Sequence, residues 1–120
     1  MLASFDPDTL LSHRRSTPEL DIHSEDVECV AINDLLGGLR ASHIDLLQID
    51  VEGYDHELIR ALDLERFLPS LVHFEHRHLT SAQHDECVQR LIAHGYAVCL
   101  EPHDTLACQP GDLPQPQTAP

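Results

Sequence analysis

Short apolar runs alternate with amphipathic segments through the middle of the chain. Residues 44–51 form an apolar run broken at three polar positions, and Gly53 then leads into helical spacing. A short apolar run followed by a glycine turn and a helical period predicts a buried parallel strand that feeds a helix. In open α/β sheets, ligands bind outside the carboxyl ends of the strands. The pattern therefore places Asp50, Glu52 and Gly53 at the mouth of a site.

The same pattern predicts further elements on both sides of this run. Strands are expected at residues 26–32, 44–51, 71–75 and 96–100. Helices are expected at residues 34–39, 55–62 and 80–94, with one short helix near 7–13. Strands that alternate with helices predict an α/β fold with a mostly parallel sheet and right-handed crossovers.

The residues at the predicted helix ends have the chemistry that helix ends require. Asn33 is a good N-cap for the helix at 34–39. Thr80 and Gln83 have the spacing of a capping box. Gly95 stands where a glycine ends a helix in the left-handed conformation.

Composition divides the chain into three parts. Residues 1–25 are polar and form a loop-rich entry segment, residues 26–101 carry the predicted core, and residues 102–120 are rich in proline. The proline-rich part is expected to be disordered. No apolar run approaches the ~18 residues that span a bilayer, and the first residues lack the features of a signal peptide. We therefore expect a cytoplasmic protein without a membrane partner.

The charge is strongly negative. Seven arginines, no lysine and 21 acids give a formal net charge of −14. So few cations cannot neutralise a run of phosphates, which excludes nucleic acid as an expected partner. The four cysteines form no CxxC pair, so reduced thiols in a cytosolic setting are expected. Cys29, Cys87 and Cys99 sit in apolar patterns and are expected to be small buried hydrophobes.

Three segments of the chain resemble one known family. Residues 46–59 read LLQIDVEGYDHELI, which resembles the signature of the FkbM family of S-adenosylmethionine-dependent methyltransferases. Residues 32–36 and 69–76 resemble the segments that precede and follow that signature. Gln48 stands where the family usually has lysine. The resemblance implies a partial Rossmann-like fold and transfer of a methyl group to a hydroxyl-bearing small molecule.

Three acids are the candidate catalytic residues. Asp50 and Glu52 would point to the same side of an extended chain, and Glu75 would end the neighbouring strand. A carboxylate there can take the acceptor's proton, directly or through a bound cation. The alternatives stay open: Asp50 binding turn amides, Glu52 capping the helix, and Glu75 pairing with a neighbour on its strand, His73 or Arg77.

The resemblance also implies a cofactor, S-adenosylmethionine, with Gly53 and Tyr54 as its candidate contacts in this chain. The alternatives are that Gly53 is needed for a tight turn and that Tyr54 packs. A cofactor of this kind needs a glycine-rich turn after a strand. None of the five glycines forms a GxG turn after a strand, so the main binding loop is absent from this sequence. The chain is therefore expected to be the carboxyl-terminal half of such an enzyme.

Other classes of function remain open. A non-catalytic α/β module would bind a partner along its sheet edge, and half of a doubly wound sheet is expected to self-associate or to pair with a complementary chain. A histidine-rich metal-binding module is suggested by residues 73–78, where His76 and His78 are two apart, with His84 and His103 downstream. No third and fourth ligand follow at a recognisable spacing, so no metal ligand is assigned.

Overall fold

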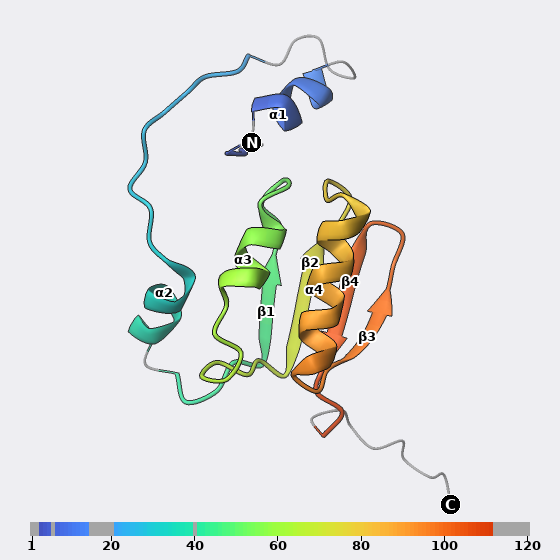
Figure 1. Cartoon of the computed structure of the whole chain (residues 1–120). Coiled ribbons are helices and arrows are strands. Elements are labelled where there is room, and N and C mark those ends of the chain that lie inside the picture. The colour runs from blue at the N-terminus through green and yellow to red at the C-terminus, as the bar shows by residue number, and fades with distance from the viewer. Residues whose placement is uncertain (1–2, 6, 15–20, 40, 112–120) are drawn as a thin grey trace, which may run out of the picture.

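The computed structural model describes residues 3–5, 7–14, 21–39 and 41–111 (Figure 1). The elements in chain order are α1 (Pro7–Arg14), α2 (Ile32–Gly38), β1 (Leu46–Ile49), α3 (Asp55–Ala61), β2 (Leu71–Glu75), α4 (Ser81–Ala93), β3 (Ala97–Leu100) and β4 (Asp104–Cys108). The predicted α/β class is confirmed.

The sheet is mixed, and the prediction of a mostly parallel sheet is wrong. Its strand order is β1-β2-β4-β3. β1 and β2 pair in parallel, whereas β4 pairs antiparallel with β2 on one side and with β3 on the other. β4 turns back from β3 as a hairpin and separates β3 from β2. The predicted crossover from β2 through α4 therefore leads to a strand that is not the neighbour of β2.

The strand β4 lies inside the segment that was expected to be disordered from residue 102. Thr105 and Ala107 are fully buried, and the residues that alternate with them are half-buried. Pro102 and Pro110 stand outside the strand, so neither removes a hydrogen bond from its ladder. The expectation of disorder is wrong here because it rested on proline content and overlooked the alternation between the prolines. Residues 112–120 lie outside the described residues.

The predicted strand at residues 26–32 is also wrong. Residues 21–31 have no regular structure, and α2 begins at Ile32. Asn33 is not the N-cap of this helix, because Ala31 occupies that position. The Asn33 amide instead donates to the Ala61 carbonyl at 2.8 Å and accepts from the Asp63 backbone N–H at 2.8 Å. Asn33 thereby fastens α2 to the end of α3.

The ends of α4 agree with the sequence prediction. The Thr80 side chain accepts from the Gln83 backbone N–H, and the Gln83 side chain accepts from the Thr80 backbone N–H, so the capping box is complete. Gly95 follows the helix with a φ of 88°, a conformation that favours glycine. The chain then enters β3 as expected.

Helices α3 and α4 lie on the same face of the sheet (Figure 1). The core between them and the strands consists of Leu36, Ile49, Ile59, Leu62, Leu64, Val72, Phe74, Cys87, Leu91, Tyr96 and Ala107. Cys87 is buried as predicted, but Cys29 and Cys99 are exposed, which corrects the prediction for both. Burial raises the pKa of the Cys87 thiol to about 12, so this thiol stays protonated and inert.

The opposite face of the sheet is less covered. Along β2, Val72 and Phe74 are buried toward the helices, whereas Leu71 and His73 are only half-buried. Leu46 on the edge strand β1 is aligned with Leu71 on this face and is 51% exposed. Leu100 on β3 is 61% exposed, but it pairs with the buried Thr105 and so lies on the face that carries the helices. The sheet therefore presents apolar side chains on a face that these helices do not cover.

Arg90 on α4 holds the carboxyl end of α3. Its Nε donates to the Ile59 carbonyl at 3.1 Å, and its Nη2 donates to the Leu62 carbonyl at 2.7 Å. The last carbonyls of a helix have no partner within the helix, and a cation there also complements the helix dipole. Arg90 thus joins two helices through one side chain.

We predict that Arg90→Met lowers the free energy of unfolding by about 2 kcal/mol, because it removes two hydrogen bonds from a charged donor. Arg60→Met is the matched control, since Arg60 is an exposed residue of α3 whose ion pair with Glu57 spans 3.0 Å at the surface. An exposed pair of this kind is worth at most about 0.5 kcal/mol. Urea unfolding of both variants measures the difference, and equal losses would contradict the role of Arg90.

Candidate functional site

The carboxyl ends of β1 and β2 bring candidate residues together. The parallel register pairs Ile49 with Phe74, so Asp50 and Glu75 follow next to each other on neighbouring strands. Asp50 is exposed and Glu75 is half-buried. The charge of Asp50 acts on Glu75 and contributes to raising its pKa. The structure thus gathers at one sheet edge two of the acids that the sequence singled out.

Glu52 also lies at this end of the sheet, but its backbone does not have the predicted extended conformation. The chain leaves β1 after Ile49 and turns at Glu52, whose φ is 52°, and at Gly53, whose φ is 100°. Residues with positive φ cannot continue an extended strand, so the expected strand alternation of Asp50 and Glu52 is wrong. Glu52 does not cap α3 either, because Tyr54 is the N-cap and accepts no side-chain hydrogen bond.

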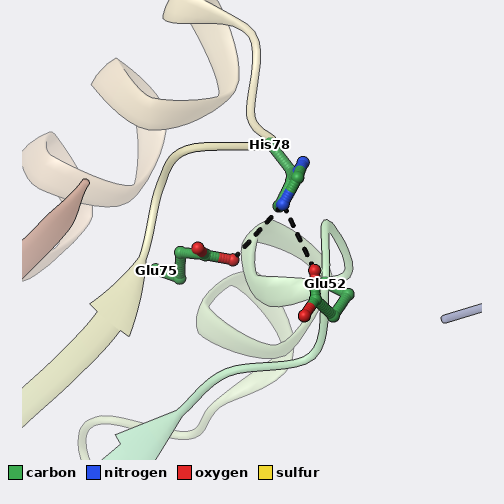
Figure 2. Close-up of side chains that lie close together, drawn as sticks. All are labelled: Glu52, Glu75 and His78. Atoms are coloured by element: carbon green, nitrogen blue, oxygen red, sulfur yellow. Dashed lines mark ion pairs between the residues drawn. The ribbon is translucent and has the colours of Figure 1, made fainter. Parts of the chain in front are cut away.

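Glu52, Glu75 and His78 form a compact cluster, which we call the strand-end cluster (Figure 2). His78 Nε2 lies 3.2 Å from Glu52 Oε2 and 3.7 Å from Glu75 Oε2. The three side chains are 16% to 19% exposed. Figure 2 shows them pointing toward one another from the turn after β1, the end of β2 and the loop after β2.

Glu75 is the member of this cluster with a buried carboxylate oxygen that accepts no hydrogen bond from the described residues. Its Oε2 is buried and has no hydrogen-bond partner among the described residues. Burial raises the pKa of Glu75, and the nearby His78 opposes that rise, whereas Asp50, Glu52 and Asp55 add to it. The carboxyl group therefore holds a proton more readily than an ordinary glutamate.

Asp55 lies beneath the turn as the first residue of α3. It is fully buried, its Oδ2 accepts from the Gly53 backbone N–H at 3.2 Å, and its Oδ1 has no partner among the described residues. Burial raises the pKa of Asp55, while its backbone hydrogen bonds lower it. A buried carboxyl group at the start of a helix also benefits from the positive end of the helix dipole. Asp55 thus fixes the turn that carries Glu52 and Gly53.

A cavity adjoins the exposed side of this edge. Its volume is about 860 Å³, and its lining includes Asp50, Glu52 and the N-terminal residues Asp21 and Glu25. The hydroxyl of Ser4 donates to the Glu52 carbonyl at 2.8 Å. Tyr54 is 42% exposed, and the ring of Phe5 packs against it edge-on with centroids 5.1 Å apart. The cavity therefore combines acidic and apolar lining residues and is large enough for a small molecule.

The histidines of the 73–78 segment do not form one site. His76 Nδ1 and His84 Nε2 both contact the buried Thr105 hydroxyl, at 2.9 Å and 2.8 Å, and their rings stack with centroids 4.2 Å apart. His78 belongs instead to the strand-end cluster. Arg77 is exposed, and Glu75 lies near His78 rather than pairing with Arg77 or His73. The suggested His76–His78 pair is therefore separated by the turn that follows β2.

Sequence reasoning missed two residues at this edge. His78 was paired with His76 in the sequence, because only the turn after β2 brings it back toward Glu75. Asp55 was not among the candidate residues, yet it is fully buried beside the turn. The position of Asp55 two residues after Gly53 was a usable signal, since short acids often accept from nearby backbone N–H groups in turns.

Comparison with known proteins identifies the family. The model of the methyltransferase FkbM domain matches residues 1–98, which is most of the chain. The chain belongs to the FkbM methyltransferase family. A search of curated proteins and a search of solved structures returned no significant match. The resemblance of the three segments to this family is thereby confirmed.

Membership of a methyltransferase family implies S-adenosylmethionine as the methyl donor in general, yet the described residues of this FkbM chain do not fit the donor's binding loop. The glycine that follows a sheet strand, Gly53, already donates its N–H to Asp55. Gly37 and Gly38 lie in α2, and Gly95 ends α4. Among the described residues, no glycine-rich turn therefore opens a helix toward a ligand.

None of the described helices of the FkbM chain is both long enough and apolar enough to cross a bilayer.

We predict that Asp55→Asn stabilises the FkbM chain at about pH 7 and less so at acidic pH. A raised pKa means that the Asp55 contribution to stability is fully present below its ordinary value of 3.8 and is lost as the pH rises through the folded-state pKa. Asparagine keeps an acceptor for Gly53 and removes the buried charge.

Urea unfolding at about pH 7 and about pH 4 measures this difference. Asp85→Asn, an exposed position on α4, is the control and should change little at either pH. A loss of stability at neutral pH in Asp55→Asn would show that the carboxylate itself is required.

Proposed function

We propose that the chain takes part in transfer of a methyl group from S-adenosylmethionine to a hydroxyl group, and that it forms the acceptor side of the site. The observation that carries the proposal is the gathering of Asp50, Glu52, Glu75 and His78 where two adjacent parallel strands end. This edge is where α/β folds bind their ligands. The family assignment supplies the reaction class.

Each residue of the edge has a distinct chemical capacity. Asp50 is exposed beside the cavity and is the group that would accept the proton of a hydroxyl placed there. Proton transfer to a positioned carboxylate contributes about 10²- to 10⁴-fold to a rate. Glu52 lines the same cavity, and together with Glu75 and His78 it would set the electrostatic field at the acceptor. Holding the acceptor in line with the donor is the remaining requirement of a displacement at carbon.

The methyl donor would be held mainly by elements outside this sequence. The fit of the described residues to the donor's loop is poor, and Gly53 and Tyr54 would contribute at most the edge of such a site. We propose that a complementary chain, or a second copy, covers the apolar face and the β1 edge, where Leu46 is 51% exposed. Exposed strand edges and apolar faces of this kind usually pair with another element. The proposed setting of the assembled protein is the cytoplasm.

The exposed face also supports a second candidate function, a module that binds a partner protein and carries out no chemistry. Leu71, Leu106 and Cys108 are half-buried on that face of the central strands, and Cys99, which pairs with Leu106, is exposed on it. A module of this kind would depend on the apolar face of the sheet and would not require the acidic residues at the strand ends. Substitution of Asp50 therefore distinguishes the two functions.

The test of the first function is Asp50→Asn in the assembled protein, assayed by transfer of labelled methyl groups to hydroxyl compounds. We expect turnover to fall by about 10²-fold or more with little change in stability, because Asp50 is exposed. Asp45→Asn is the matched control, since Asp45 is an exposed aspartate just before the other end of β1. Unchanged turnover in Asp50→Asn would exclude the assigned role.

Association is tested by sedimentation of the isolated chain over a range of concentrations. We expect dimers or larger species that dissociate when Leu46→Glu and Leu100→Glu place charge on the apolar edges. A monomer at every concentration, with no mass gained on mixing with a candidate complementary chain, would contradict the partner proposal.

A further inference from the structure

The geometry points to a divalent metal site at the strand-end cluster, with Glu52, Glu75 and His78 as its three protein ligands. Each residue offers one ligand atom, and these atoms all lie within 4.8 Å of one another. The site would take a transition-metal ion such as Mn²⁺ or Zn²⁺. This inference is independent of methyl transfer, because it concerns an ion that the chain binds by itself.

The distances fit coordination of a single ion. Metal bonds to histidine nitrogen and to carboxylate oxygen are about 2.0–2.2 Å long, so two ligands at right angles lie about 3 Å apart and two at a tetrahedral angle about 3.4 Å apart. His78 Nε2 lies 3.2 Å from Glu52 Oε2 and 3.7 Å from Glu75 Oε2. Small side-chain movements therefore suffice to close both distances onto one ion.

The backbone holds the three ligands before any ion binds. Glu52 is held by the left-handed turn that Gly53 and the Asp55 carboxyl group stabilise. Glu75 ends β2, whose neighbours on both sides fix its position. His78 sits in the turn that the Leu79 N–H closes onto the His76 carbonyl at 3.0 Å. Ligands fixed in this way lose little conformational freedom when an ion binds.

Two buried carboxylate oxygens near this cluster accept no hydrogen bond from the described residues. Glu75 Oε2 and Asp55 Oδ1 are both buried and have no hydrogen-bond partner among the described residues. Asp55 is fully buried, and its charge acts on Glu75 together with those of Asp50 and Glu52. Buried charges are ordinarily paired or bind a metal. A divalent cation would satisfy Glu75 directly and would offset the repulsion among the acids.

The donor atoms indicate the class of ion. Two carboxylate oxygens and one imidazole nitrogen form a mixed set, in which the nitrogen favours Zn²⁺ or other transition metals and the oxygens are compatible with Mn²⁺. Three protein ligands leave further positions for water or for a hydroxyl. An ion here would lower the pKa of a bound hydroxyl, and Asp50 would stand beside it to accept the proton.

A second group of side chains provides a comparison within the same sheet. His73, Glu101 and Asp104 also place one ligand atom each within 4.8 Å of one another, but Glu101 is exposed. This group includes neither of the two buried oxygens without a partner. We therefore assign the ion to the strand-end cluster and use the second group as the control.

The experiment is titration of the whole chain with Mn²⁺ and with Zn²⁺, followed by calorimetry and by metal analysis after desalting, with no methyl donor present. We expect one ion per chain, and affinity lower by more than about tenfold in Glu75→Gln and in Glu52→Gln. Glu101→Gln should bind as the unmodified chain does. Circular dichroism checks that each variant is folded.

Paramagnetic broadening by Mn²⁺ locates the ion without any substitution. We expect the amide signals of Glu52, Gly53 and His78 to broaden first, and those of Leu46 and Cys108, which lie at the opposite end of the sheet, to persist. Broadening centred on Glu101, loss of binding in Glu101→Gln alone, or no binding of either ion would overturn the assignment. Because no step requires methyl transfer, these outcomes are distinct from failure of the proposed function.

Discussion

The parallel pairing of β1 with β2 is the constraint on which the site depends. It sets Ile49 opposite Phe74, so both strands end at the same level of the sheet. The loops that follow them then lie side by side, and each carries polar residues. A shift of this register by one residue would turn the side chains of one strand to the other face and separate the acids. Burial of Ile49 and Phe74 under α3 and α4 fixes the register.

Around this pairing, the face of the sheet under α3 and α4 is well packed. The region at the carboxyl ends of β1 and β2 instead contains buried carboxylate oxygens that accept no hydrogen bond in the described chain. Helices α3 and α4 are joined by hydrogen bonds from Arg90 and by the ion-pair contact of His56 with Glu86 at 2.9 Å. At the carboxyl ends of β1 and β2, in contrast, Asp55 and Glu75 carry buried oxygens that accept no hydrogen bond in the described chain, although Glu75 Oε2 lies 3.7 Å from His78 Nε2. Left-handed backbone at a residue other than glycine, as at Glu52, is costly and concentrates at functional sites. The strained backbone of Glu52 and the buried carboxylate oxygens that accept no hydrogen bond therefore lie in the same small region.

Elements set by local chemistry agree with the sequence prediction, whereas elements set by strand pairing do not. The capping box of Thr80 and Gln83, the end of α4 at Gly95 and the strand at 71–75 depend on local chemistry, and they were predictable. The strand at 26–32 and the position of β4 depend on which segments pair across the sheet, which periodicity alone does not state. The proline content predicted disorder in the segment that contains β4, although Thr105 and Ala107 alternate with half-buried residues.

The sequence by itself determined the α/β class, the family signature and the identity of the acids that follow β1. Those features follow from local spacing, because a strand, its glycine turn and its helix are contiguous in the chain. Only the tertiary structure decided that Glu52 leaves the strand through a left-handed turn, that His78 folds back beside Glu75, and that Asp55 is buried. These outcomes depend on two loops meeting in space, and the distance between loops is set by strand pairing and helix packing.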